Sequence, residues 1–294
     1  MTNKSVLKKL KKDYLDYVLT WVDAKKLAAV KVEFCVSKIM ADIISALVFR
    51  KSGQPDFKVK WDADGDRVFF KDEKGRKIPA YFITALLAKI IQGKYPKAKI
   101  VHDSRLIWAI QDSVKNTYYE RERVKRFSSG ARGSYICKAG WPNFLNFMHK
   151  NKILFGGEAS GHYYFASFAS KKRFSSRARG SYFNRDLVLN DGIIPILLIA
   201  EQNKSLSELI RPYRAKYFIS GEMNFKKKID LKKLAREYQN AKISHLDGLS
   251  VEYPNYRFNL RQSQTENLWR LNIEARDKNL LQEKKKELYE KLQA

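Results

Sequence analysis

Residues 96–115, PKAKIVHDSRLIWAIQDSVK, decide the structural class of the chain. Residues 99–101 read as a short strand, and residues 106–115 have the apolar spacing of a helix. The same order returns downstream, where the strand-like residues 153–155 enter a glycine-containing loop and Asp191 precedes an expected helix over residues 192–201. Strands that alternate with helices predict a parallel or mixed sheet covered by helices, that is, an α/β domain.

The segment before this stretch predicts a shorter series of elements. In chain order they are an amphipathic helix, a strand, a buried helix, a strand and a helix, over residues 4–19, 30–34, 39–49, 57–61 and 81–92. The polar, lysine-rich residues 93–97 interrupt the pattern. A break of this kind predicts a domain boundary.

The end of the chain has a different pattern. Asp230 is placed to cap a helix that runs to residue 238, and Asp247-Gly248 between two strand-like runs is a strong signal for a two-residue hairpin. Further strands are expected over residues 217–225, 256–260 and 268–274, before a final charged helix. This order predicts a small α+β domain with an antiparallel sheet.

The composition limits the class of protein. A chain of 294 residues with 44% apolar and 13% aromatic residues can form two or three domains with real cores. No window is apolar enough to span a membrane, and the lysine-rich start has no apolar run typical of a secretory signal. Cys35 and Cys137 are too few for a disulfide scaffold or a cysteine zinc site. We therefore expect a cytoplasmic protein without a membrane partner.

The formal charge of +27 predicts attraction to phosphate groups. The lysines are scattered along the chain, which favours solvated helix faces over a nucleic-acid surface. A short repeat adds to the charge: residues 126–135 (RFSSGARGSY) and 173–182 (RFSSRARGSY) differ at one position. We expect both copies to be mobile surface loops, either tolerated insertions or basic arms that grip phosphates.

Three carboxylates follow the predicted strand at residues 57–61. Asp62, Asp64 and Asp66 alternate in DADGDR, and Gly65 lets such a loop curl so that the oxygens meet, a donor set that suits magnesium. An EF-hand is the obvious competitor, but Arg67 stands where that loop needs glycine, and no helix immediately precedes it. An ordinary acidic turn is the remaining alternative.

A second motif, GGEASGH, covers residues 156–162. Its glycines allow close approach of the backbone to a ligand, and Glu158, Ser160 and His162 offer groups suited to sugar hydroxyls. A nucleophilic Ser–His pair is a rival, although residues two apart rarely reach that geometry and no third partner is evident. A plain glycine-rich connection is equally compatible with the pattern.

A third polar cluster lies at an expected turn between two strands. Arg261, Ser263, Gln264 and Thr265 fall in RQSQT, and Arg270 follows on the next strand. Arginine, hydroxyl and amide groups at a turn can hold a phosphate. A polar hairpin turn without a ligand would have the same composition.

Taken in order, the three motifs resemble a known family. DADGDR, GGEASGHYYF and RFNLRQSQTENLWRLNIEA are similar to the metal, sugar-binding and phosphate-binding loops of the phosphohexomutases of the phosphomannomutase/phosphoglucomutase type. Residues 191–194 and 246–248 also fit, and the resemblance covers most of residues 54–280 apart from the repeats.

The resemblance implies an isomerase of carbohydrate metabolism that moves a phosphoryl group on hexose phosphates through Mg²⁺ and a phosphoserine. Arg67 would then assist at the phosphoryl group as the catalytic residue. The metal ligands would be Asp62, Asp64 and Asp66; the sugar ligands Glu158, Ser160 and His162; the phosphate ligands Arg261, Ser263, Gln264, Thr265 and Arg270. The implied chemistry is stabilisation of phosphoryl charge together with positioning.

The chain departs from the family pattern in several places. No serine lies in the family's Thr-Ala-Ser-His-Asn-Pro type loop, and the segment between the first strand and the metal loop is short. Lys58 and Lys60 occupy a strand that the resemblance expects to be buried on both faces. Trp141 stands in place of the usual histidine, and Gln264 in place of asparagine.

These patterns predict three units: a truncated metal-loop α/β domain (residues 1–97), a sugar-binding α/β domain with both repeats (98–210) and a phosphate-binding α+β domain (211–294). The leading hypothesis is the C-terminal portion of a phosphohexomutase that cannot turn over unaided, completed by an N-terminal partner chain. A decayed remnant without function and a basic nucleic-acid-binding protein are the alternatives.

Overall fold

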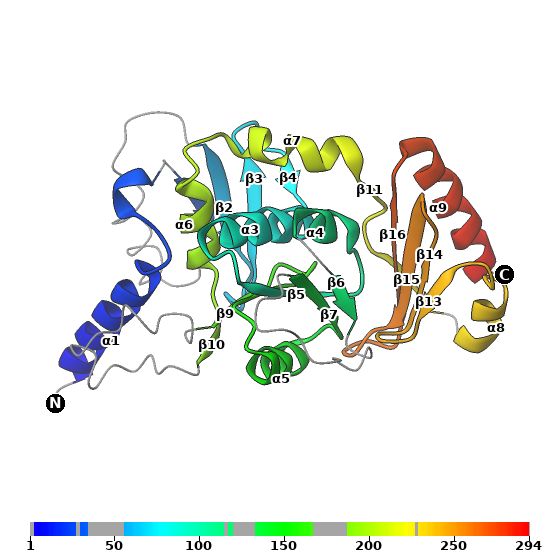
Figure 1. Cartoon of the computed structure of the whole chain (residues 1–294), viewed down its shortest axis with the longest axis horizontal. Helices are drawn as coiled ribbons and strands as arrows, with labels where there is room; N and C mark the ends of the chain where they lie inside the picture. Colours follow the sequence, from blue (N-terminus) through cyan, green and yellow to red (C-terminus); the bar gives the residue numbers. More distant parts are fainter. Residues whose placement is uncertain are drawn as a thin grey trace.

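Three β-sheets with helices packed around them make up the chain in a computed structural model (Figure 1). The structure describes residues 3–27, 30–34, 56–114, 117–119, 133–166, 187–226 and 229–293. The predicted buried helix over residues 39–49 lies outside these ranges, as do the second repeat and most of the first.

The first sheet has four strands in the order β1-β2-β3-β4. They are β1 (Val30–Phe34), β2 (Phe57–Trp61), β3 (Val68–Asp72) and β4 (Lys77–Ile78). β1 and β2 are parallel, whereas β2, β3 and β4 are antiparallel neighbours. Burial alternates along β2, with Phe57, Val59 and Trp61 inside and the two lysines of that strand on the other face.

The second sheet is mixed, in the order β10-β9-β8-β5-β7-β6. Its strands are β5 (Lys99–Asp103), β6 (Thr117–Tyr119), β7 (Gly133–Cys137), β8 (Phe155–Gly157), β9 (Tyr163–Ala166) and β10 (Val188–Asn190). β8, β5, β7 and β6 are parallel, and at one edge β9 pairs antiparallel with β8 and β10 antiparallel with β9. The prediction of a mixed sheet from alternating strands and helices is therefore confirmed.

Helices surround these two sheets, with α3 and α4 in front of the strands and α5 below them in Figure 1. They are α1 (Asn3–Val18), η1 (Ala24–Lys26), α3 (Ala80–Lys94), α4 (Trp108–Ser113), α5 (Trp141–Asn151), α6 (Ile193–Ala200) and α7 (Leu206–Lys216). α3 packs against β8, α6 and α7, and all eight residues of α6 are buried. Asp191 accepts hydrogen bonds from the amides of Ile193 and Ile194, so it caps α6 as the sequence indicates.

One apolar core runs through these first two sheets, from Tyr17 on α1 to Tyr217 after α7. Trp21 shows how the N-terminal helix joins it, since its ring contacts Tyr95 and Phe165 edge to face at 5.8 and 5.1 Å. Because buried aromatic pairs add to burial itself, this contact anchors α1 to the second sheet. The proposed domain limits at residues 97/98 and 210/211 stay predictions.

The C-terminal part is an antiparallel sheet with its own core, at the end of the molecule opposite α1 (Figure 1). Its elements are β11 (Phe218–Ile219), β12 (Met223–Phe225), α8 (Leu231–Arg236), β13 (Lys242–Ser244), β14 (Leu249–Glu252), β15 (Tyr256–Gln262), β16 (Trp269–Ala275) and α9 (Lys278–Gln293). The α+β prediction for this part is confirmed, and Asp230 caps α8 as expected.

Three local predictions are wrong. The strand expected over residues 217–225 is two short strands, because Gly221, with φ of +73°, turns the backbone between β11 and β12. Residues 245–248 join β13 to β14, so the hairpin loop is longer than Asp247-Gly248 alone. The last residues of the first repeat belong to β7, where Ser134 and Tyr135 are buried rather than on a surface loop.

Candidate functional site

The acidic loop connects β2 to β3 and is closed by its own first carboxylate. Asp62 Oδ1 accepts hydrogen bonds from the amides of Gly65 and Arg67 at 3.0 and 3.2 Å. Gly65 has φ of +74°, a conformation that glycine adopts without strain. As a result, Asp62, Asp64 and Asp66 each offer one oxygen within 4.8 Å of the others.

This oxygen set fits the chemistry of a small divalent cation. Three carboxylates are the hard donors that magnesium prefers, and Asp64 is exposed and has no partner among the described residues. The Arg67 Nε atom lies 3.2 Å from Asp62 Oδ2 and 3.8 Å from Asp66 Oδ1, so one positive charge offsets part of the negative charge of the loop. Counted from Asp62, Glu73 stands at the twelfth position, where an EF-hand has its last ligand, but it binds Ser207 on α7 instead.

The GGEASGH loop lies between β8 and β9 and closes on itself through backbone bonds. The Glu158 amide donates to the His162 carbonyl at 3.0 Å, and the Gly161 amide donates to the Glu158 carbonyl at 3.1 Å. Glu158 is 4% exposed, and Tyr164 and Ser160 donate to its two carboxylate oxygens at 2.7 and 3.1 Å. The buried carboxylate is thus held in one orientation by its neighbours.

The acidic and glycine-rich loops touch directly. His162 Nε2 lies 3.0 Å from Asp66 Oδ2, and the Val68 amide donates to the Gly161 carbonyl at 3.2 Å. Asn190 at the end of β10 also holds the acidic loop, since its side chain donates to the Asp66 carbonyl. Burial opposes ionisation of Asp66, but the hydrogen bond and charge of His162 bring the pKa of that carboxyl below its ordinary value. Two motifs that lie 90 residues or more apart in the chain therefore form one surface.

The sequence argument against a Ser–His pair is wrong on geometry. Ser160 Oγ lies 3.0 Å from His162 Nδ1, and Asp66 supplies the third partner that was not evident from the sequence. The Ser160 hydroxyl has one proton and two neighbours that can accept it, Glu158 Oε2 at 3.1 Å and His162 Nδ1 at 3.0 Å. General-base action by His162 requires this proton to point to Nδ1 rather than to Glu158.

Sequence reasoning missed a buried arginine that supports the glycine-rich loop. Arg105, 5% exposed, lies after β5, and its Nη2 atom is 2.7 Å from Asp103 Oδ2 and 3.3 Å from Glu158 Oε2. Asp103 Oδ2 also accepts the Ala159 amide at 2.8 Å. Burial opposes ionisation of Asp103, yet attraction and hydrogen bonds from Arg105 lower its pKa to about 2. The polar run Asp103-Ser104-Arg105 at the end of a parallel strand was the available signal.

The RQSQT turn joins β15 to β16. Ser263 Oγ accepts the amides of Thr265 and Glu266 at 3.4 and 3.2 Å, which shapes the turn. Arg261 is 6% exposed and makes no hydrogen bond or ion pair with a described side chain. Arg270, directly opposite it, is instead held by Glu266 and Glu222. Of the two arginines, Arg261 is therefore the one without a hydrogen bond or ion pair to a described side chain, and Asp247 acts on it through charge alone.

A segment before α5 joins the RQSQT turn to the glycine-rich loop. Gln264 Nε2 donates to the Ala139 carbonyl at 3.3 Å, and the Ala139 amide donates to Asp247 Oδ2 at 3.1 Å. Trp141, 41% exposed, follows and packs on Tyr164 with ring centroids 5.3 Å apart. The structure therefore brings all three motifs into one connected region, the third through this segment rather than by direct contact.

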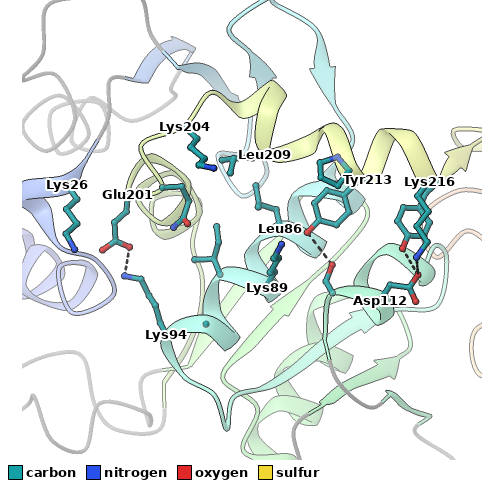
Figure 2. Close-up of a pocket in the computed structure, with 16 residues that line it drawn as sticks. Lys26, Leu86, Lys89, Lys94, Asp112, Glu201, Lys204, Leu209, Tyr213 and Lys216 are labelled. Carbon is teal, nitrogen blue, oxygen red and sulfur yellow. Dashed lines mark hydrogen bonds and ion pairs between the residues drawn. The ribbon is translucent and has the colours of Figure 1, made fainter.

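A wide cleft of about 810 Å³ lies elsewhere, between α3, α6 and α7 (Figure 2). Its carboxylates are already paired: Glu201 with Lys94, and Asp112 with Lys216. Among the described residues, none that lines this cleft belongs to the three motifs. We therefore assign the candidate active site to the connected loops.

Comparison with known proteins agrees with this geometry. Residues 129–217 match the domain described as "Phosphoglucomutase/phosphomannomutase, alpha/beta/alpha domain III". The chain is 35% identical over 243 residues to "Phosphohexose mutases" of Xanthomonas campestris pv. campestris, covering 79% of this chain and 47% of the relative. It is 34% identical over 231 residues to the phosphomannomutase of Escherichia coli K12, covering 75% of this chain and 44% of the relative.

Solved structures show the same fold. A phosphoglucomutase/phosphomannomutase family protein from Burkholderia thailandensis superposes with a TM-score of 0.68 at 17% identity, covering 96% of this chain and 63% of that one. A putative phosphomannomutase from Thermus thermophilus gives 0.61 at 15% identity, covering 96% and 66%.

The fold and the three connected loops define a phosphohexomutase-type α/β protein, and the chain belongs to the phosphohexomutase family. It spans about half the length of the curated relatives that it matches, and its coverage fits the C-terminal portion of the family. No helix in the described part of the chain is long and apolar enough to cross a membrane.

Proposed function

We propose that this chain supplies the magnesium-, sugar- and phosphate-binding surfaces for phosphoryl transfer on hexose phosphates. The observation that carries the proposal is the link from Asp66 through His162 and Ser160 to Glu158, at 3.0, 3.0 and 3.1 Å. It joins the acidic loop to the sugar-type loop, so a phosphoryl group at one would lie beside a sugar at the other.

Each loop has a part in this proposal. Asp62, Asp64 and Asp66 would hold Mg²⁺, which supplies positive charge for the transferred phosphoryl oxygens. Arg67 would add a second cationic contact beside them, since its guanidinium already lies between two of these carboxylates. Glu158 would accept hydrogen bonds from sugar hydroxyls in a fixed orientation, because Tyr164 and Arg105 hold it.

The other end of the substrate would meet the C-terminal part. Arg261 would bind the phosphate that is not transferred, since its buried guanidinium makes no hydrogen bond or ion pair with a described side chain. Ser263, Gln264 and Thr265 line the same turn, while Arg270 would shape it through its two glutamates. Trp141 would offer an exposed ring next to Tyr164 and the sugar.

The phosphoryl donor is a separate part of the proposal. None of the 294 residues forms the serine loop that the family resemblance requires. We therefore propose that these residues alone do not interconvert hexose phosphates and that a serine-bearing segment outside them, on a partner chain, completes the reaction.

A thermal melt with and without Mg²⁺ plus glucose 1,6-bisphosphate tests the binding role. A cooperative melt that moves upward with ligand is expected, because ligand bound to the folded state adds to its stability. Asp64→Asn should remove the Mg²⁺-dependent part and Arg261→Gln the bisphosphate part, whereas Lys286→Gln on α9 should change neither. An unchanged melting temperature in the wild-type chain would refute the site, and a broad transition would favour the decayed remnant.

A coupled assay of mannose 1-phosphate isomerisation tests the donor role. No turnover is expected from the chain alone, and turnover should appear only when a serine-bearing domain is added. Robust turnover by the chain alone would overturn this part and leave the binding role standing.

A further inference from the structure

Lysines form a row across the outer face of the first sheet. The strand register pairs Lys31 with Lys58, Lys58 with Lys71, and Lys71 with Lys77, one lysine from each of the four strands. Lys60 lies one step along β2 on the same face, opposite Phe69. We call the row Lys31, Lys58, Lys71 and Lys77 the lysine row.

We expect the lysine row to lower the stability of the folded sheet. Like charges directly opposite each other on neighbouring strands are destabilising. Glu33 is the one described carboxylate that pairs with the row, reaching Lys71 at 2.6 Å. Its pKa is lowered by the hydrogen bond from Lys71, with smaller contributions from the charges of Lys71, Lys58 and Lys31. Lys31, Lys58 and Lys77 have no ion pair in the described part of the chain.

A groove of about 660 Å³ lies along the same face. Lys58, Lys60, Lys71 and Lys77 line it together with the half-buried Phe69 and the apolar Pro79 and Ala80. Among the described residues that line it, the acidic ones are Glu33 and Glu222. The groove therefore combines surplus positive charge with an apolar floor, where Lys60 lies 6.0 Å from the centre of the Phe69 ring.

The cleft in Figure 2 provides a contrast on the same molecule. Four of the five described lysines that line it have acidic neighbours: Lys94 pairs with Glu201, Lys216 with Asp112, Lys204 with Glu208 and Lys26 with Asp23. Charge there is largely balanced within the chain. On the outer sheet face Lys31, Lys58 and Lys77 have no ion pair among the described residues, which leaves them available to acidic groups of a partner.

We propose that the groove along the lysine row binds an acidic amphipathic helix of a partner protein. Acidic side chains on such a helix would pair with the unpaired lysines, and its apolar side chains would cover Phe69, Pro79 and Ala80. The occupant is not a second copy, because a chain of charge +27 repels its own kind. A partner with a continuous surface of phosphate groups is disfavoured, because Glu33 and Glu222 line the groove and repel phosphate. Phe69 has no polar group that binds phosphate.

A peptide titration of the full chain tests this surface. The probe is a labelled helical peptide of about 20 residues with glutamate along one face and leucine along the other. Binding is followed by fluorescence anisotropy at about 0.15 M salt, where weak nonspecific charge attraction is screened. The triple variant Lys58→Gln/Lys60→Gln/Lys77→Gln should bind about tenfold more weakly, on the scale of three lost exposed charge pairs.

The matched control removes the same charge elsewhere. Lys232→Gln/Lys233→Gln/Lys286→Gln changes three exposed lysines of the C-terminal part and should alter the affinity by less than about twofold. Polyglutamate, which lacks an apolar face, should bind the wild-type chain more weakly than the peptide. A melt of each variant verifies that the sheet is folded.

Several results would overturn the proposal. Equal losses of peptide affinity in the two triple variants would show that net charge alone explains the binding. If polyglutamate bound as tightly as the peptide, the apolar part of the groove would have no role in binding. A loss specific to the lysine row with polyuridine RNA or with phosphatidylserine vesicles, but not with the peptide, would assign the face to nucleic acid or membrane. None of these outcomes depends on hexose phosphate binding, so the surface and the proposed function can fail separately.

Discussion

At the scale of single residues, the candidate site depends on buried contacts that do not tolerate an added atom or a lost charge. Gly157 at the end of β8 lies against α3, where an added Cβ would be 2.5 Å from Thr84 Cγ2 and 2.7 Å from its Oγ1. Asp103 lies behind the same loop and is paired with Arg105 in a buried position.

Gly157→Ala is expected to destabilise the chain by about 1–3 kcal/mol, because the new methyl group overlaps Thr84 in a packed interior. Urea unfolding measures the loss. Thr84→Ala in the same chain removes both clashing atoms and should restore most of it. A double variant no more stable than Gly157→Ala alone would show that the overlap with Thr84 is not the cause.

Asp103→Asn is expected to cost about 2–3 kcal/mol near neutral pH, because the folded-state pKa of about 2 lies below the ordinary value of about 3.9. A depressed pKa adds stability above the unfolded-state value, and that stability is lost as the pH falls toward 2. The gap between wild type and Asp103→Asn should therefore close between about pH 4 and pH 2. Urea unfolding across this range checks it, and a gap independent of pH would contradict the prediction.

At the scale of elements, the outer strands of the first sheet combine good inward packing with poor outward charge balance. β2 buries Phe57, Val59 and Trp61 on one side, while Lys58 faces Lys31 and Lys71 on the other. Alternation along the strand makes these two faces independent. Charge on the outer face can thus change without disturbing the core.

Lys58→Gln is expected to stabilise the chain by about 0.5 kcal/mol, since it relieves repulsion from two opposed lysines. The gain should shrink as salt rises, because exposed charges are screened. Lys286→Gln, on the exposed face of α9, should have no such salt-dependent gain. Melts at low and high salt make the comparison, and a destabilised Lys58→Gln chain would argue that Lys58 is a structural residue.

At the scale of the whole molecule, one buried carboxylate fastens the C-terminal sheet to the rest. Glu274 on β16 is fully buried and accepts from Tyr81 on α3 at 2.5 Å and from the Ile107 amide at 2.7 Å. Arg257 on β15 pairs with it at 2.9 Å and donates to the Ser104 and Arg105 carbonyls. The position of the RQSQT turn relative to the other loops depends on this network.

Glu274→Gln is expected to destabilise the chain by about 3–5 kcal/mol, because Arg257 is left as a buried charge without its paired carboxylate. Calorimetry should also show the C-terminal sheet melting apart from the remainder. The exposed Glu290→Gln is the control. Arg257→Met/Glu274→Leu should recover part of the loss. A single transition with unchanged stability would mean that the network does not hold the parts together.

The sequence by itself determined the mixed α/β and antiparallel α+β classes, most helix and strand positions and the three polar motifs. These features depend on local periodicity, caps and composition, as the cap of Asp191 on α6 illustrates. Only the tertiary structure decided which motifs meet: the contact of His162 with Asp66, the buried support of Arg105 and the burial of Arg261 without a hydrogen bond or ion pair to a described side chain. Local sequence patterns do not predict such contacts, because the residues lie dozens of positions apart in the chain. Their charged groups pair specifically only when folding buries them next to each other.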